Sequence, residues 1–326
     1  VIVGHTANLQ EAVGLWPKPE GAAYVFRPDG KGGVEAVAPP PPSVMAPDAG
    51  PAVGLRPVGN AAFDALVSAE IEKAVRAQVD AGVSIVSDGE LGKVGYSTYI
   101  TSRLSGFGGH VDRVPAKDLA DLPELRTKLA AIMGTQGFVR ASCIGKVRLI
   151  DSRPVDDDIR RFASAMRKQG KDVRGFMNAA SPGLVTAFQP NQFYPTHEAY
   201  LADLVEAMRP QYEAIVAAGF DLQLDAPDLA MAAHTGFQSL SEAEFLRRAE
   251  QNVEALNAAT ANIPPERMRM HICWGNYEGP HDHDIPLERV IDIVIKARPA
   301  TVLFEAANPR HEHEWKVWAE AKLPNH

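Results

Sequence analysis

Short apolar runs alternate with helical patterns along most of this chain, and this alternation constrains the fold more than any other feature. A strand-sized run can pair in parallel with the next one only if a helix returns the chain to the same end of the sheet. We therefore expect an α/β protein with a parallel sheet. With a first candidate at Val1–His5, the expected strands number seven, and the other six are 83–87, 146–150 with an alternative start near Ser142, 173–178, 220–224, 268–273 and 301–304.

The residues that directly follow these strands carry ionisable or metal-binding groups. In an eight-stranded α/β barrel the loops after the strands build the active site. The sequence thus predicts a (β/α)8 TIM barrel in which residues 1–326 form a single domain. A doubly wound open sheet is the alternative, and the absence of a strand-linked G-x-G-x-x-G motif argues against a dinucleotide-binding version. The strand-end groups are Asp88 and Glu90, Asp225, His271 and Cys273, and Glu305.

Local signals give several helix boundaries. Asn60 is expected to cap a helix that ends at Gly82, and Ser241 with Glu244 forms a capping box. Pro210 should kink or split a long helix over 196–218. The remaining expectations are helices over 156–168, 286–297 and from about 311, weakly patterned helix over 111–138, and an irregular loop over 96–110.

Residues 16–58 are rich in proline and glycine and include the run Pro39-Pro40-Pro41-Pro42. This composition disfavours helix and central strand. We expect a long surface excursion, either a lid over the site or a disordered linker.

Composition narrows the classes of partner and compartment. The net charge of −8 argues against nucleic acid or an anionic membrane as a partner. No apolar run approaches the roughly 20 residues that span a bilayer. Cys143 and Cys273 are the two cysteines, and without a secretory pattern they are expected to be reduced thiols of a cytoplasmic protein. A homo-oligomer is compatible with all of this.

His271 and Cys273 lie two residues apart at the end of an expected strand, so they project to the same side. Imidazole nitrogen and thiolate sulfur are preferred ligands of Zn²⁺. The spacing alone is a weak signal for zinc, and a buried pair packing under a loop is the alternative. Two further groups, 281–284 and 311–313, contain metal-like residues but are expected to be solvated loops.

From about residue 60 onward the chain resembles the C-terminal catalytic barrel of cobalamin-independent methionine synthase. It more closely resembles that enzyme's single-barrel relatives, which include zinc-dependent epoxyalkane:coenzyme M transferase. The resemblance is carried by Ser87-Asp88-Gly89-Glu90, Leu222-Gln223-Leu224-Asp225-Ala226-Pro227, His271-Ile272-Cys273-Trp274-Gly275-Asn276 and Phe304-Glu305-Ala306-Ala307.

The resemblance implies a set of site residues. His271, Cys273 and Glu305 match zinc ligands of the family, while Asp225 and Glu90 match acidic groups that contact the amino group of the thiol substrate. Asp225 could also serve as a base, or as a helix N-cap with no role in the site. Further residues expected to line the substrate pocket are Asp88, Tyr96, Trp274 and Asn276, and Trp274 could instead be part of the core.

This chain departs from the family pattern in three places. Ala226 stands where methionine synthase has glutamate, and the first strand lacks the Gly-Ser-(Phe/Tyr)-Pro pattern, which leaves the thiol acceptor open. No cysteine follows Cys273, and the chain stops at His326 before an eighth strand. Because seven parallel strands leave open edges, we expect the eighth strand and the last thiolate to lie in a longer natural protein. The alternatives are a partner chain, or a zinc site completed by water, His311 or His313.

The function that these patterns predict is a zinc-dependent transferase that moves a methyl or other alkyl group from a small donor onto a zinc-activated thiol. A competing prediction is a barrel lyase or decarboxylase that uses Glu90 and Asp225 as acid and base without a thiol acceptor. A metal- or ligand-binding protein without turnover is the third alternative.

Overall fold

The computed structural model describes residues 25–28, 34–38, 61–93, 98–112, 114–132, 139–169, 173–275, 279–304 and 310–322. Several expectations fall outside these ranges, namely the strand at Val1–His5, the cap at Asn60, and the site roles of Tyr96, Asn276 and Glu305. The helices of the described part include none long and apolar enough to cross a membrane.

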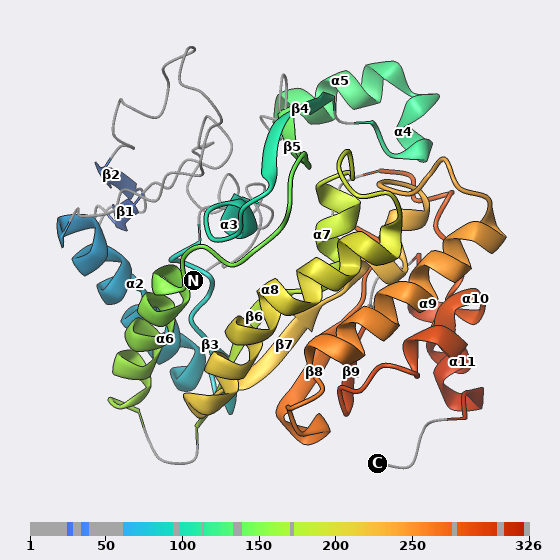
Figure 1. Ribbon diagram of the computed structural model, residues 1–326. Coiled ribbons are helices and arrows are strands. Elements are labelled where there is room, and N and C mark those ends of the chain that lie inside the picture. Colours follow the sequence, from blue (N-terminus) through green and yellow to red (C-terminus); the bar gives the residue numbers. More distant parts are fainter. Residues whose placement is uncertain are drawn as a thin grey trace. The chain divides into compact units, whose positions relative to one another are not determined.

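A parallel sheet of five strands forms the centre of the fold, in the order β3-β6-β7-β8-β9 (Figure 1). The described pairings β3–β6, β7–β8 and β8–β9 are all parallel, which confirms the predicted α/β class. Closure into an eight-stranded barrel stays a prediction. The strands are β3 (Ile85–Ser87), β6 (Arg174–Ala180), β7 (Asp221–Asp225), β8 (Met268–His271) and β9 (Thr301–Leu303).

The chain divides into two compact units, which are described separately below. Unit 1 comprises Val1–Leu104, Lys128–Phe138 and Ile150–Phe176, and unit 2 comprises Ser105–Thr127, Val139–Leu149 and Met177–His326. The division falls within β6, so that the first residues of this strand pair with β3 in unit 1 and the later ones belong to unit 2. The single-domain barrel stays a prediction.

In unit 1, α2 (Ala61–Asp80) packs against α6 (Arg153–Met166), and a short helix α3 (Thr98–Thr101) follows β3. The apolar stripe of α2 is the reason for this packing, because Ile71 and Val75 are completely buried. Gln78 of α2 bonds to both the backbone N–H and the carbonyl of Ser87, which fixes the end of β3. The predicted helix up to Gly82 is confirmed.

The proline- and glycine-rich segment contains two described strands, β1 (Val25–Pro28) and β2 (Val34–Ala38). They pair with each other in an antiparallel ladder as a separate two-stranded sheet. Proline is tolerated here because Pro28 stands at the end of its strand. The composition argued against helix and central strand, and this two-stranded sheet contains neither, while the role of the segment as a lid or linker stays a prediction.

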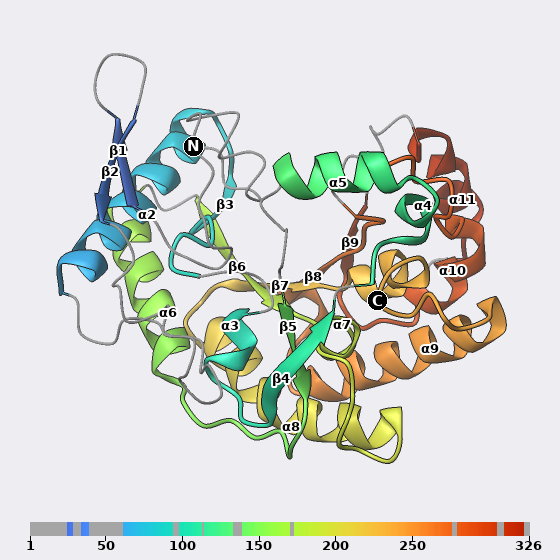
Figure 2. The same ribbon diagram turned by 90° about the horizontal axis from the view of Figure 1, so that it is seen from above.

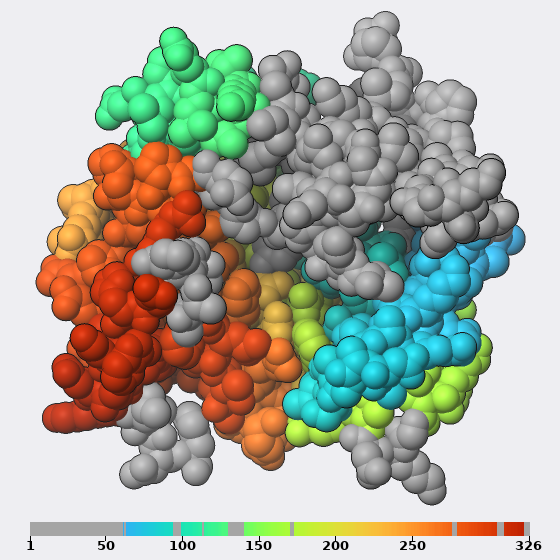
Figure 3. Space-filling view, turned by 180° about the vertical axis from the view of Figure 1, so that it is seen from behind, coloured from blue at the N-terminus to red at the C-terminus, as the bar shows by residue number. Residues whose placement is uncertain are grey.

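Along the chain of unit 2, helices alternate with the parallel strands. Helix α8 contacts α9, and α9 contacts α10 (Figure 1). The predicted capping box at Ser241 and Glu244 is confirmed, but Pro210 lies inside one continuous helix rather than splitting it. Helix α11 lies at the surface of this unit (Figure 3). The helices are α7 (Pro182–Phe188), α8 (His197–Ala217), α9 (Glu242–Ala259), α10 (Leu287–Val294) and α11 (Trp315–Glu320).

An antiparallel pair, β4 (Phe107–Asp112) and β5 (Val139–Cys143), forms a third sheet (Figure 2). This pair corrects three expectations. Residues 107–110 are strand and not irregular loop, residues 111–112 are strand and not helix, and of the strand expected over 146–150 only its alternative start near Ser142 coincides with a strand, β5. Near residues 146–150 the backbone bonds include one from the Ser105 N–H to the Arg148 carbonyl at 2.9 Å. Between β4 and β5, α4 (Lys117–Ala120) and α5 (Pro123–Ile132) supply the expected helix.

A glycine substitution tests how tightly this region is packed. Gly106 has φ +91°, and a Cβ there would lie 2.5 Å from the Gly145 carbonyl oxygen, which is backbone and cannot rotate away. Gly219 has a similar φ of +93° with open space around its Cβ position. We expect Gly219→Ala to cost about 1 kcal/mol from backbone strain alone and Gly106→Ala about 1 kcal/mol or more beyond that. Urea unfolding of the two variants measures the difference, and equal losses would contradict the packing argument.

Candidate functional site

The carboxyl ends of β7, β8 and β9 meet in one row of unit 2. Asp225 pairs with His271, and His271 pairs with Leu303, so the three residues stand at the same level of adjacent strands. The row continues toward the loops, where the Ala226 N–H bonds to the His271 carbonyl at 2.8 Å and the Ile272 N–H to the Leu303 carbonyl at 3.0 Å. This is the edge at which parallel α/β folds hold their ligands.

Burial alternates along β8 and the residues after it. Met268, Met270 and Ile272 are buried, whereas His271 and Cys273 are only partly buried. Residues two apart in an extended chain face the same side, so His271 and Cys273 share the less buried face at the end of this strand. The Cys273 carbonyl also accepts a bond of 3.2 Å from the Met231 N–H, which joins the loops after β7 and β8.

Asp225 lies beside His271 at the strand end. Its Oδ1 lies 3.4 Å from His271 Nδ1, and the same oxygen accepts a hydrogen bond of 3.2 Å from Gln223 Nε2. The carboxylate is buried, with a side chain only 6% exposed, while the His271 side chain is 36% exposed. A buried carboxylate beside one imidazole nitrogen is the type of group that can orient a histidine ring.

The donor set at this strand end fits a zinc ion. His271 has its Nδ1 3.4 Å from Asp225 Oδ1 and a partly exposed ring, and Cys273 is a partly buried cysteine outside any disulfide. Imidazole and thiolate are the usual zinc donors. The third expected ligand, Glu305, lies outside the described residues, so the full ligand set stays a prediction.

Trp274 is fully buried beside this strand end. Its indole Nε1–H donates to the Ile285 carbonyl at 2.6 Å, and its ring stacks on His311 with centroids 4.1 Å apart. These contacts are those of a core residue, one of the two roles that the sequence left open. Contact between Trp274 and a substrate stays untested.

Asp88 and Glu90 belong to unit 1, in the turn after β3. Asp88 is 2% exposed, its Oδ1 accepts the Glu90 N–H at 3.0 Å, and burial raises the pKa of its carboxyl to about 6. Glu90 has φ 54° and forms an ion pair of 2.7 Å with Lys93. Burial lowers the pKa of Lys93, but the Glu90 and Asp88 carboxylates outweigh it and the net shift is upward. A left-handed glutamate bonded in this way marks a turn with a fixed geometry.

A second set of polar side chains lies buried in the loops of unit 2, and we call it the histidine cluster: His234, His281, Asp284, His311 and Glu314. Asp284 is its centre, since its carboxylate lies 3.2 Å from His234 Nδ1, 2.9 Å from His281 Nδ1 and 2.8 Å from His311 Nε2. His311 Nδ1 in turn lies 2.9 Å from Glu314. The expectation of a solvated loop holds for Asp282, His283, Glu312 and His313, which are exposed, but is wrong for His281, Asp284 and His311.

The charges of this cluster depend on its hydrogen bonds. Burial lowers the pKa of His311, but its bonds to Asp284 and Glu314 outweigh burial and raise the pKa to about 9. Burial raises the pKa of Asp284, yet the hydrogen bonds from His281 and His311 lower it overall. Burial lowers the pKa of His234, which is therefore neutral at pH 7.

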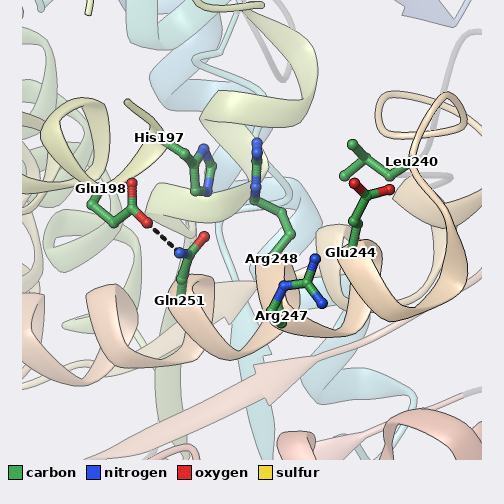
Figure 4. Close-up of a pocket in the computed structure, with 7 residues that line it drawn as sticks. All are labelled: His197, Glu198, Leu240, Glu244, Arg247, Arg248 and Gln251. Carbon is green, nitrogen blue, oxygen red and sulfur yellow. Dashed lines mark hydrogen bonds between the residues drawn. The ribbon is translucent and has the colours of Figure 1, made fainter. Parts of the chain in front are cut away.

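A pocket between the start of α8 and the first turns of α9 is a separate concave feature (Figure 4). Figure 4 shows Glu198 bonded to Gln251 on one side of it. Its charges balance, and it has no residue in common with the strand-end row. The pocket is lined by His197, Glu198, Leu240, Glu244, Arg247, Arg248 and Gln251.

His197 connects this pocket to a buried polar chain. Its Nε2 lies 2.8 Å from Asn252 Oδ1, the Asn252 amide donates to Asp228 at 2.9 Å, and the Ser181 hydroxyl donates to Asp228 at 2.7 Å. Burial lowers the pKa of His197 to about 4 and raises that of Asp228 to about 6.

These shifts predict how stability changes with pH. The folded pKa of His197 is below its unfolded value of about 6.5, so its contribution to stability is present above pH 6.5 and is lost as pH falls toward 4. We expect the advantage of wild type over His197→Asn to shrink by about 2 kcal/mol across this window. Urea unfolding at several pH values measures this difference, with the exposed His283→Asn as the control. A difference independent of pH would contradict a neutral, buried His197.

Comparison with known proteins finds partial similarity to methionine synthases. No known family model matches the chain. A curated methionine synthase from Pyrococcus furiosus is 23% identical over 198 residues, which are 60% of this chain and 48% of that protein. The chain thus spans about half the length of the curated relative that it matches.

Two solved structures are similar. A B12-independent methionine synthase from Shewanella sp. W3-18-1, in complex with selenomethionine, has a TM-score of 0.53 and 18% identity, and covers 73% of this chain and 62% of its own. A chain from Listeria monocytogenes, assigned by structural genomics to the same enzyme, has a TM-score of 0.43 and 18% identity, and covers 65% of this chain and 56% of its own. By sequence and by fold, this chain is similar to cobalamin-independent methionine synthases, whereas the narrower resemblance to epoxyalkane:coenzyme M transferase stays a prediction.

Proposed function

We propose that this chain transfers a methyl or other alkyl group from a small donor to a thiol that is held on a zinc ion by His271, Cys273 and Glu305. The observation that carries the proposal is the shared face of His271 and Cys273 at the end of β8, with Asp225 beside His271 Nδ1 at 3.4 Å. Similarity to methionine synthases supports thiol methylation as the reaction class.

Zinc would supply the activation of the thiol, because a bound thiol loses its proton well below its free pKa of about 8.5. The protein's own part is to hold the donors in place. Asp225 fixes the imidazole tautomer so that Nε2 offers its lone pair. Glu305 follows Leu303 by two residues, as Cys273 follows His271, and Leu303 and His271 are in register. This equal spacing supports Glu305 as the donor from the next strand.

The remaining expected site residues are proposed to contact the substrates. Glu90 is assigned to the substrate's ammonium group and Asp88 to positioning Glu90, because Asp88 accepts the Glu90 N–H. Tyr96, Trp274 and Asn276 are assigned to the pocket wall on sequence grounds, and the burial of Trp274 makes it the weakest of the three assignments.

The alkyl donor is proposed to be small, such as an epoxide, a sulfonium compound or an aryl methyl ether. Because this chain spans about half of its curated relative, we extend only the thiol alkylation, and not the whole activity of that relative, to this chain.

The lyase alternative requires Asp225 as an acid or base. In unit 2 this carboxylate is buried, accepts a hydrogen bond from Gln223 and lies beside His271. Such contacts suit an orienting group better than one that exchanges protons with a substrate.

The test is zinc analysis followed by a screen of donors with and without thiol acceptors, including homocysteine and coenzyme M. We expect about one zinc ion at the strand-end site and turnover only when a thiol is present. Turnover of a donor alone would support the lyase reaction, and tight binding without turnover of any pair would support a binding protein.

A further inference from the structure

The histidine cluster contains three metal-type donors that converge at a place other than the strand-end row. We infer that His234, His281 and Asp284 bind a divalent cation, zinc in preference, as a second metal site of unit 2. One ligand atom from each of these residues lies within 4.8 Å of the other two, and both histidines are buried.

The separations fit tetrahedral coordination. Asp284 Oδ1 lies 3.2 Å from His234 Nδ1 and 3.2 Å from His281 Nδ1. With zinc–nitrogen and zinc–oxygen bonds of about 2.0–2.1 Å, two ligands of a tetrahedral zinc lie about 3.3 Å apart. The donors need little rearrangement to accept an ion. The His281 Nδ1 must be unprotonated to ligate a metal, so any proton on it is released to solvent when the metal binds.

The surroundings hold the Asp284 carboxylate in place. Its Oδ2 lies 2.8 Å from His311 Nε2, and the other nitrogen of His311 lies 2.9 Å from Glu314. The second oxygen of Glu314 accepts the Leu287 N–H at 2.7 Å at the start of α10. Ligating carboxylates in metal sites are usually held by such an outer layer of hydrogen bonds.

His281 has a backbone conformation that a histidine rarely adopts, with φ 59°. Its N–H donates to Asp118 Oδ2 at 2.9 Å, a contact that fixes this conformation. A left-handed backbone at a buried, non-glycine residue costs on the order of 1 kcal/mol and persists where the position of the side chain matters. In His281 this conformation directs the imidazole toward Asp284 and His234.

Charge also favours a cation here. Asp118, Asp284 and Glu314 bring three carboxylates into a region where each residue is buried or nearly so. Buried carboxylates are stable only when cations or hydrogen bonds compensate them. A divalent ion between His234, His281 and Asp284 would add such compensation.

The position of the site suggests a structural role. His234 follows β7, whereas His281 and Asp284 follow β8, so an ion would join two loops that leave the strand-end row. His311 links the cluster to Trp274, the residue directly after Cys273. The ion would therefore stabilise the loops without touching the substrates.

The experiment uses the 326-residue chain carrying Cys273→Ser, which removes the only thiol of the strand-end site. The protein is stripped with a chelator and titrated with Co²⁺ and Zn²⁺. We expect about one ion per chain, cobalt absorption without a thiolate charge-transfer band, and a rise of the unfolding midpoint by about 5–10 °C at saturating Zn²⁺. Either His234→Ala or Asp284→Asn in this background should abolish the bound ion, the cobalt absorption and the rise of the unfolding midpoint. If His234→Ala does not fold, His234→Gln takes its place.

The matched control is His283→Ala, which removes an exposed histidine from the same loop and should keep the ion. Absence of metal binding and of the thermal shift in the Cys273→Ser protein overturns the inference. Failure of the proposed function gives a different result. In that case the wild-type chain shows no thiolate-to-cobalt band, while the site formed by His234, His281 and Asp284 still binds cobalt.

Discussion

Replacing Cys273 by alanine is expected to lower thiol alkylation by at least about a thousandfold, equivalent to about 4 kcal/mol of transition-state free energy. Cys273 is a partly buried cysteine two residues after His271, outside any disulfide, and Cys143 is the only other cysteine of the sequence. Without it the strand end loses its softest donor, so zinc binds too weakly to activate a substrate thiol. Metal content and turnover are measured on the same preparation.

Cys143 provides the matched control for this substitution. It is also a free cysteine, but it is completely buried and burial raises the pKa of its thiol. A thiol of this kind is a packing group and not a ligand. Cys143→Ala should therefore retain metal and activity and lose only about 1 kcal/mol of stability. Full activity in Cys273→Ala, or equal losses in the two variants, would remove the basis of the proposed function.

Replacing Asp225 by asparagine is expected to weaken zinc binding at the strand end by about 10- to 100-fold. The amide keeps the shape of the carboxylate but lacks its charge, so His271 is no longer held with its Nδ1 proton toward a negative partner. Competition with a chromophoric chelator measures the affinity. The same variant should lose activity that added zinc partly restores, because the ligands themselves remain.

Asp221 is the control at the opposite end of β7. It is also buried, and it forms an ion pair of 2.9 Å with Arg267. Asp221→Asn removes a paired charge from the same strand, so it should cost stability but leave zinc affinity unchanged. If both variants bind zinc as tightly as wild type, Asp225 does not orient a ligand, and the substrate-binding or base role expected from the sequence becomes the better assignment.

Patterns that depend on near neighbours predicted the elements of the fold well. The capping box of α9 is formed by residues three apart, and the stripe of α2 is formed by residues three and four apart. Both appear where the sequence places them. Strand β8 was likewise visible, since the apolar Met268 and Met270 alternate with the polar Arg269 and His271 in a short run.

The β4–β5 pair could not be found in this way. Gly108 and Gly109 within β4 are poor strand residues, and the partner of Phe107 is Cys143, far along the chain. The apolar alternation at 146–150 was a stronger local signal than the real strand before it. Pairing across such a separation is decided by tertiary contacts and not by propensity.

The same distinction between local patterns and long-range contacts applies to the candidate sites. The spacing of His271 and Cys273 was readable because two residues of one strand need no tertiary information. The partnership of Asp225 with His271 depends on the register of two strands, and the histidine cluster depends on contacts such as that between His281 and Asp118, 163 positions apart. Residues 281–284 look like a solvated loop until those distant partners are known.

The row of Asp225, His271 and Leu303 also sets a length. Adjacent strands in a sheet are about 4.8 Å apart, so the first and last residues of this row are separated by about 10 Å. A ligand that bonds to groups on both outer strands would have to span about that distance, whereas a shorter one would be confined to two neighbouring strands.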